Sequence, residues 1–253
     1  MMFVDSHTHL TRLEVSPEEA VERAAGAGVI AVVNIGTDVE DSKRGAELAA
    51  VLPNVYSSAG IHPHNAGTYT AADLEALAEL SESPGIVALG EVGLDYYRGD
   101  WSGEIQRALF EDVISLANDT RLPLIIHSRK AFSDTFGILA RARVPVVLHC
   151  FEGGESEVRE AEARGYYVGL AGNVTYKNSR TAEVLGMLDP KRILVETDAP
   201  YLSPQAVRKE ANEPKNVAYT ARFVAERIEM DEEEFGLLTS RNARDLFGLP
   251  LKV

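Results

Sequence analysis

The chain has 253 residues, of which 45% are hydrophobic and 25% are charged, a composition typical of a globular protein with a sizeable core. Its formal net charge of −14 argues against tight binding to duplex nucleic acid, because proteins that bind phosphates in this way usually carry a basic surface. A phosphodiester substrate is not excluded, since divalent cations held by a carboxylate-rich site make that site locally positive.

No feature of the sequence predicts membrane association or export. No uninterrupted apolar run approaches the ~20 residues that span a bilayer, and the opening segment MMFVDSHTHL has neither the basic nor the apolar region of a signal peptide. The single cysteine, Cys150, cannot form an internal disulfide. We therefore expect a cytoplasmic protein with no membrane contact, and no obligate protein partner is indicated.

Short β-branched apolar runs alternate with amphipathic stretches from one end of the chain to the other, which is the pattern of repeated strand–helix units around a parallel sheet. The strands are predicted at residues 2–5, 29–34, 55–60, 86–90, 124–127, 146–149, 166–170 and 192–196. Helices are predicted at residues 17–27, 71–80, 102–120, 216–228 and 232–247. Since no linker, repeat or low-complexity segment interrupts the pattern, we expect one domain over residues 1–253, a single (β/α)8 TIM-type barrel of the α/β class.

Residue types that bind metals gather at the ends of these predicted strands. They follow the first, fourth, fifth, sixth and eighth strands, and they are His7, His9, Glu91, His127, His149 and Asp198. In this barrel class the carboxyl ends of the strands form one rim, where active sites are built. The pattern therefore predicts that these side chains meet.

The two histidines of His7-Thr8-His9 point to the same side of an extended strand and can bind one cation, although such a pair alone is weak evidence. His127 and His149 each end an apolar run, where either one alone reads better as a satisfied core histidine. Buried carboxylates need a cation, a proton or several hydrogen-bond donors. Two divalent metals satisfy all six groups at once, whereas any other interpretation needs a separate partner for each. We therefore predict a metal-dependent hydrolase.

Other polar residues near the strand ends have two possible roles. Arg129 could bind a phosphate in bidentate fashion, or it could pair with Asp134 or Glu91. His62 and His64 could contact the substrate or donate a proton, or they could belong to a loop fixed by the proline between them.

The aromatic residues near the same rim are open to two interpretations as well. Tyr96 and Tyr97 could offer a stacking surface to a nucleobase, although such pairs more often pack a loop. We take Tyr96, His62, His64 and Arg129 as the candidate substrate contacts. Cys150 is interpreted as a small buried residue, and not as a thiolate ligand.

Together these residues resemble the TatD family of metal-dependent deoxyribonucleases, within the amidohydrolase-like superfamily. The resemblance covers nearly the whole chain. Its motifs are Asp5-Ser6-His7-Thr8-His9-Leu10, Gly60-Ile61-His62-Pro63-His64, Gly90-Glu91-Val92-Gly93-Leu94-Asp95-Tyr96, His127-Ser128-Arg129, His149-Cys150-Phe151, Glu196-Thr197-Asp198-Ala199-Pro200-Tyr201-Leu202, Asn212-Glu213-Pro214 and Asn242-Ala243.

The resemblance implies a two-metal site with His7 and His9 on one ion, His127 and His149 on the other, and Glu91 bridging them. Asp198 would complete the ligands of the first ion and orient or deprotonate the attacking water, so Glu91 and Asp198 are the predicted catalytic residues. The metals would activate a hydroxide for attack on phosphorus. The ligand types suit zinc, manganese, nickel or iron, and suit magnesium less well.

The implied activity is cleavage of single-stranded DNA from its 3′ end, so the expected partner is single-stranded DNA or another nucleic-acid 3′ end. Some members of the family instead remove D-amino acids from tRNA, which makes an aminoacyl-tRNA deacylase, or another ester or amide hydrolase, the alternative. A non-catalytic binding barrel would not need an open dimetal site. Two departures from the family pattern, Ala211 and Glu152, touch expected substrate contacts and leave the metal residues intact.

Overall fold

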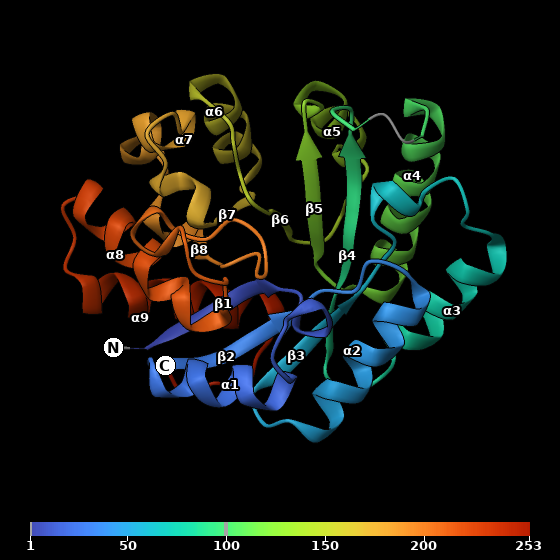
Figure 1. Cartoon of the computed structure of the whole chain (residues 1–253). Helices are drawn as coiled ribbons and strands as arrows, with labels where there is room; N and C mark the ends of the chain where they lie inside the picture. The colour runs from blue at the N-terminus through green and yellow to red at the C-terminus, as the bar shows by residue number, and fades with distance from the viewer. Residues whose placement is uncertain (1, 99–100) are drawn as a thin grey trace. The chain divides into compact units, whose positions relative to one another are not determined.

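The computed structural model describes residues 2–98 and 101–253, and these form two compact units (Figure 1). Unit 1 comprises Met1–Asn34 and His149–Val253, and unit 2 comprises Ile35–Leu148. The prediction of one domain over residues 1–253 stays a prediction. None of the described helices is long and apolar enough to cross a membrane.

Unit 1 is built on four parallel strands and the helices that cover them. The strands are β1 (Phe3–Thr8), β2 (Val29–Asn34), β7 (Tyr167–Leu170) and β8 (Ile193–Val195), with β1 paired to β2 and β7 paired to β8. The helices are α1 (Pro17–Gly26), α6 (Glu155–Arg164), α7 (Arg180–Val184), α8 (Val217–Arg227) and α9 (Glu232–Phe247). Helices α8 and α9 pack against each other and against β1 and β8, as Figure 1 shows.

The ends of the unit 1 helices follow from local chemistry. Ser16 caps α1 by accepting a hydrogen bond from the backbone of Glu19 at 3.2 Å. Asp231 caps α9 in the same way, and Gly248 ends that helix with a φ of 64°. From within α9, the Asn242 side chain donates to the carbonyl of Ile193 at 2.8 Å and so attaches the helix to β8.

Unit 2 repeats the same strand–helix alternation. Its parallel strands are β3 (Val55–Ala59), β4 (Ile86–Asp95), β5 (Leu124–Arg129) and β6 (Val146–Leu148). Its helices are α2 (Val39–Val51), α3 (Ala71–Ser81), α4 (Gly103–Thr120) and α5 (Phe132–Leu139). Helix α4 is buried at Leu109 and Val113, while Ile105 near its start is exposed.

The eight strands follow one another in chain order, β1 to β8, in one parallel sheet. The (β/α)8 fold class predicted from the sequence is therefore confirmed. All eight predicted strands are present, and the five predicted helices begin and end within two residues of their expected positions.

Three strands extend further than the apolar pattern predicted, so His7, Glu91, Asp95 and Arg129 lie within strands and not after them. The largest difference is in β4, where the apolar run stops at Leu89 and the strand continues to Asp95. Gly90 and Gly93 have φ values of 134° and 141°, which side-chain-bearing residues rarely adopt. A Cβ at Gly93 would lie 2.1 Å from the carbonyl oxygen of His127, so the glycine allows β4 and β5 to approach closely at the candidate ligands.

Candidate metal sites

Unit 1 brings together four of the six predicted metal ligands. His7 lies in β1, His9 follows it, and Asp198 follows β8; each offers a ligand atom, and these atoms lie within 4.8 Å of one another. The Asp198 Oδ1 atom is 3.6 Å from His7 Nε2 and 3.3 Å from His9 Nε2. The fourth ligand, His149, stacks its ring on that of His7 at a centroid distance of 3.7 Å.

Backbone hydrogen bonds join β1 to the segment after β8 and fix this arrangement. Asp198 donates its amide to the carbonyl of His7 at 2.9 Å, and His9 donates to the carbonyl of Ala199 at 2.8 Å. Burial raises the pKa of Asp198, but the hydrogen bond from His9 and the charges of His149 and His7 outweigh burial, so the pKa lies below its ordinary value. Asp198 is therefore ionised at neutral pH.

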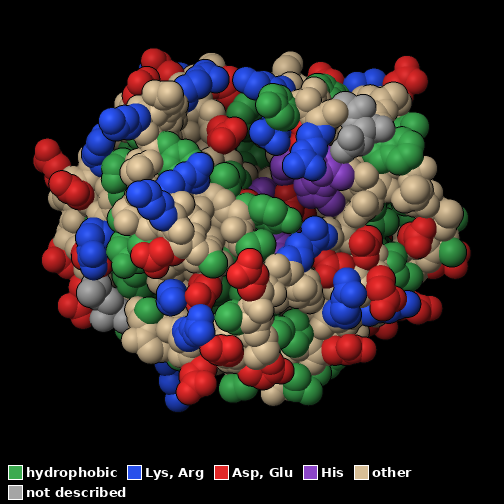
Figure 2. All heavy atoms as spheres, in the orientation of Figure 1, with side chains coloured by type: hydrophobic (Ala, Val, Ile, Leu, Met, Phe, Trp, Pro, Cys, Tyr) green, Lys and Arg blue, Asp and Glu red, His purple; other side chains and the backbone are tan. Residues whose placement is uncertain are grey.

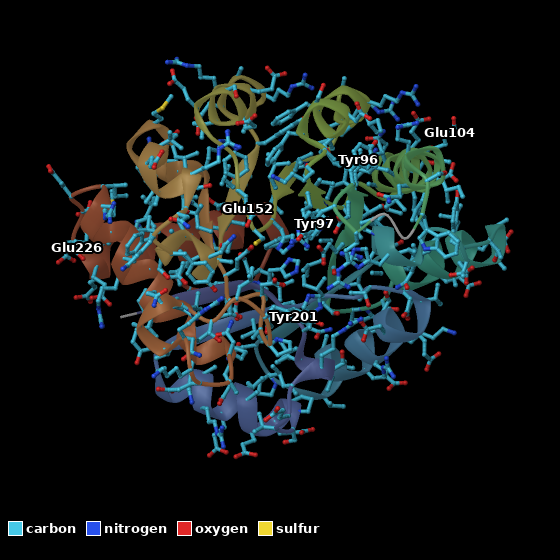
Figure 3. All side chains as sticks on the ribbon, turned by 45° about the horizontal axis from the view of Figure 1, so that its top comes forward. Tyr96, Tyr97, Glu104, Glu152, Tyr201 and Glu226 are labelled. Carbon is cyan, nitrogen blue, oxygen red and sulfur yellow. The ribbon has the colours of Figure 1, made fainter. Side chains whose placement is uncertain are left out.

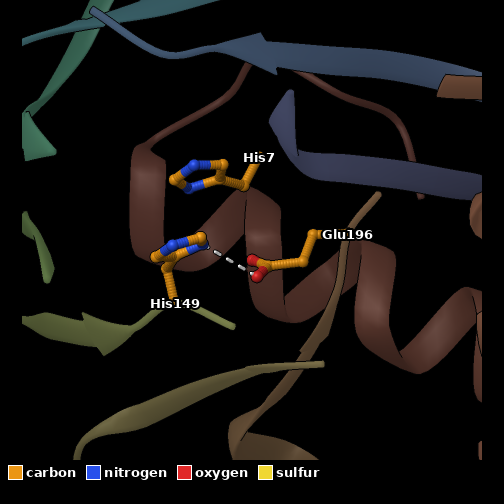
Figure 4. A group of neighbouring side chains, drawn as sticks. All are labelled: His7, His149 and Glu196. Atoms are coloured by element: carbon orange, nitrogen blue, oxygen red, sulfur yellow. Dashed lines mark hydrogen bonds and ion pairs between the residues drawn. The ribbon is translucent and has the colours of Figure 1, made fainter. Parts of the chain in front are cut away.

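Glu196 belongs to the same cluster, although the sequence analysis gave it no role. Its Oε1 atom lies 3.1 Å from His149 Nδ1 and accepts a hydrogen bond from the Cys150 amide at 2.6 Å (Figure 4). Glu196 is 1% exposed. A carboxylate in this position fixes the orientation of a ligating imidazole through the ring nitrogen that does not face the metal. The only sequence signal was its place two residues before Asp198 on an extended segment.

Replacing Glu196 with glutamine is expected to weaken metal binding by roughly 10- to 100-fold, because an amide cannot serve as a charged acceptor for both His149 and the Cys150 amide. Competition of the purified protein with a chelator measures this affinity. Glu226→Gln, on the exposed surface of α8, is the matched control. An unchanged affinity in Glu196→Gln would show that His149 does not need this carboxylate.

Unit 2 holds a second group of ligand types, made by His62, Glu91 and His127. The Glu91 Oε1 atom lies 2.8 Å from His127 Nδ1 and 3.6 Å from His62 Nε2. His62 follows β3, and its Nδ1 atom accepts a hydrogen bond from the amide of His64 at 3.1 Å. The structure therefore places His62, a predicted substrate contact, among the ligand types. The predicted sharing of a metal by His127 and His149 stays a prediction.

Asp95 connects His127 of this second group to His64. Its Oδ2 atom is 2.9 Å from His64 Nε2 and 3.3 Å from His127 Nε2, and the residue is 1% exposed. Burial raises the pKa of Asp95, but hydrogen bonds from His127, His64 and two backbone amides outweigh burial and lower the pKa well below its ordinary range. A carboxylate that stays ionised between two imidazoles holds both rings in place.

The two tyrosines near the end of β4 have different contacts in the structure. The Tyr96 hydroxyl donates to Asp134 at 2.7 Å and accepts from Arg107 at 3.0 Å, which places this ring between α4 and α5 (Figure 3). Tyr97 is exposed, and the guanidinium carbon of Arg129 lies 4.0 Å from the centroid of its ring. The sequence analysis left open whether Arg129 forms an ion pair with Asp134. In the structure Asp134 forms its ion pair with Arg107.

Comparison with known proteins identifies the family. The family model described as TatD related DNase matches residues 4–248. The chain belongs to this family. It is 36% identical over 252 residues to an uncharacterized metal-dependent hydrolase, YabD, of Bacillus subtilis, with 97% of this chain and 99% of the relative covered. It is 33% identical over 244 residues to the 3′-5′ ssDNA/RNA exonuclease TatD of Citrobacter rodentium, with 93% of each chain covered.

A solved structure agrees with this assignment. The crystal structure of YjjV, a TatD homologue from Escherichia coli, matches with a TM-score of 0.92 and 29% identity, and the match covers 98% of each chain. The chain is thus a metal-dependent hydrolase of the TatD family, and the resemblance found in its sequence motifs is confirmed.

The residues present fit divalent cations of the kind that a TatD-family hydrolase requires. Both groups combine imidazole nitrogens with carboxylate oxygens, a donor set that zinc, manganese, nickel and iron accept readily. The buried Nδ1 atom of His9 has no hydrogen-bond partner among the described residues. A buried imidazole nitrogen in that condition loses solvation without compensation, and a bound cation nearby provides a reason for its placement.

The two departures from the TatD motif pattern both lie in unit 1. Glu152 accepts a hydrogen bond from the Asn173 side chain at 3.1 Å. Ala211 is exposed and precedes Asn212, whose side chain donates to the carbonyl of Thr197 at 2.9 Å. Neither departure alters a candidate metal ligand.

Proposed function

We propose that the chain is a metal-dependent nuclease that removes nucleotides from the 3′ end of single-stranded DNA. The observation that carries the proposal is the set of three groups of ligand types, each combining histidine nitrogens with a carboxylate. Relatives that are 32–33% identical and are named 3′-5′ ssDNA/RNA exonuclease support the choice of a phosphodiester substrate.

In unit 1 the ligand types that would hold a cation form two groups that share His7: His7, His9 and Asp198, and His7, His149 and Glu196. In unit 2 the group is His62, Glu91 and His127. Divalent cations bound there supply positive charge to the phosphoryl oxygens and make a water molecule more acidic. No nucleophile from the protein is required for the reaction.

The side chains around the ligands provide the proton transfers. Asp198 is buried, and its lowered pKa keeps the carboxylate ionised, which is the form that can accept a proton from the attacking water. His64 has a side chain that is 27% exposed, and Asp95 holds its Nε2 atom. His64 is therefore the candidate to donate a proton to the leaving oxygen.

The net charge of the protein favours weak binding of single-stranded DNA. Acidic and basic side chains are interspersed over the face seen in Figure 2, and the histidines visible there have basic side chains beside them. With a net charge of −14, few phosphates are neutralised by the protein, and we expect a logarithmic salt slope that corresponds to about one to three released counterions.

Labelled oligonucleotides test the direction of cleavage. We expect 5′-labelled single strands to give a descending ladder and 3′-labelled strands to release only labelled mononucleotide, because trimming begins at the 3′ end. Duplexes of the same sequence, incubated with the same metal-loaded protein, are the matched control and should be cut more slowly.

Two results would contradict the proposal. Internal fragments from both labels would show an endonuclease. Absence of DNA cleavage together with rapid deacylation of charged tRNA would favour the aminoacyl-tRNA deacylase that the sequence leaves as the alternative.

A further inference from the structure

We propose that Tyr97 and Arg129 form a nucleotide-binding platform, in which the tyrosine ring stacks on a base of the single strand and the guanidinium binds a neighbouring phosphate. This inference rests on the proposed function and specifies how unit 2 holds the substrate. The platform is defined by these two residues alone.

The geometry of the pair is suited to such a ligand. Tyr97 follows β4 and is 62% exposed, and Arg129 ends β5 with its guanidinium carbon 4.0 Å from the ring centroid. The arginine covers one face of the ring, so the large exposed fraction belongs to the rest of it. Arg129 makes no ion pair with a described carboxylate, and its guanidinium carries five N–H donors that can bind a phosphate.

Hydrogen bonds attach the platform rigidly to the ligand group of unit 2. The Tyr97 amide donates to Asp95 Oδ1 at 2.8 Å, and the other oxygen of Asp95 contacts His64 and His127. Asp95 is the register partner of Arg129 across β4 and β5. A nucleotide on the platform would thus sit on the same two strands that carry Glu91 and His127, with its position set by a buried carboxylate.

The chemistry of the pair favours a nucleotide over other ligands. A phenol ring stacks on any base, because every base has a π face, and a guanidinium binds phosphate oxygens in bidentate fashion. An enzyme that shortens a strand one nucleotide at a time meets every base in turn, so a contact that does not depend on base identity suits it. The adjacent Tyr96 is less exposed than Tyr97, and Asp134 and Arg107 hold its hydroxyl between α4 and α5.

Arginine–aromatic pairing by itself does not define such a platform. Arg227 lies over the ring of Phe223 at 4.8 Å on helix α8, and neither residue belongs to a group of ligand types. This second pair has the same kind of contact without the attachment to Asp95. It therefore provides a matched control for replacement of either member of the platform.

Steady-state cleavage and binding of (dT)10 test the platform. In Tyr97→Leu we expect KM, and the Kd for a phosphorothioate (dT)10 that resists cleavage, to rise roughly 5- to 100-fold, because stacking on one base is lost. The value of kcat should change by less than about threefold. Tyr97→Phe, which keeps the ring, should restore most of the affinity lost in Tyr97→Leu, and Phe223→Leu should behave as the unaltered protein.

Abasic substrates identify the contact itself. Three oligonucleotides each carry a single abasic sugar, at the last, second-last or third-last position. At one of these positions the abasic sugar should reduce the affinity of the unaltered protein by the same factor as Tyr97→Leu does. At that position the losses of affinity from the abasic sugar and from Tyr97→Leu should not add. In Arg129→Gln the logarithmic salt slope should fall by about 0.7, the contribution of one phosphate contact to a single strand, and Arg227→Gln should leave the slope as it is.

The outcomes separate this inference from the proposed function. If the unaltered protein cleaves (dT)10 and Tyr97→Leu has the same KM and Kd, the platform is wrong and the nuclease proposal stands. Additive losses at all three abasic positions would also refute it. If the unaltered protein neither binds nor cleaves oligonucleotides, the proposed function fails and the platform fails with it.

Discussion

Replacing Asp198 with asparagine is expected to lower kcat by about 100- to 10,000-fold while KM changes only a few-fold. The buried carboxylate has a lowered pKa and lies 3.3 Å from His9 and 3.6 Å from His7, so it is ionised and ready to accept a proton. Asparagine keeps the shape and can still donate or accept a hydrogen bond, but it cannot take up the proton. The loss therefore belongs to the chemical step and not to substrate binding.

Cleavage of (dT)10 by metal-loaded protein measures both constants, and metal analysis of each sample distinguishes a lost proton acceptor from a lost ligand. Asp119→Asn, at an exposed position on α4, is the control. A variant with normal kcat and only a raised KM would show that Asp198 contacts the substrate instead of assisting the attack. If kcat falls only in proportion to lost metal, Asp198 acts as a ligand alone.

Much of the fold and the identity of most candidate ligands could be predicted from the sequence, because both depend on local patterns. Buried parallel strands are short runs of β-branched apolar residues, and several runs in this chain end where a polar residue appears. A histidine or carboxylate directly after such a run, as at His149 and Asp198, lies at the carboxyl end of a strand without further information. The metal-dependent hydrolase family followed from the order of these motifs.

The extent of β4 could not be predicted in this way. Its second half, from Gly90 to Asp95, contains two glycines and two carboxylates, a composition typical of a loop. These residues form a strand because β5 pairs with them and because Glu91 and Asp95 have histidine partners in the folded protein. Such partners are distant in sequence, and no local pattern contains them.

The roles of several polar residues depend on tertiary contacts for the same reason. Glu196 meets His149 across 47 residues of sequence, and the motif around it indicated only Asp198. Tyr96 and Tyr97 are adjacent and chemically identical, yet α4 and α5 occupy the hydroxyl of the first and leave the second to Arg129. The sequence alone does not distinguish the two tyrosines and leads to Tyr96 as the predicted substrate contact, whereas the contacts in unit 2 favour Tyr97 for that role.

Replacing Glu91 with glutamine is expected to reduce bound metal from two equivalents per chain to less than one and to lower activity by about 100-fold or more. Glu91 is 3% exposed, and its Oε1 atom faces both His127 and His62, so glutamine would remove the negative charge that offsets a cation in that group. The bridging role implied by the resemblance would extend the loss to both ions.

Metal analysis after dialysis against a buffer of fixed free metal concentration gives the stoichiometry, with Glu79→Gln on the exposed face of α3 as the control. Circular dichroism on the same samples separates loss of metal from loss of fold. Retention of two equivalents with normal activity would remove Glu91 from the set of ligands. Loss of one equivalent alone would make Glu91 a ligand only of the group with His62 and His127. It would refute the bridging role, because a ligand shared by two ions cannot be removed without weakening the binding of both.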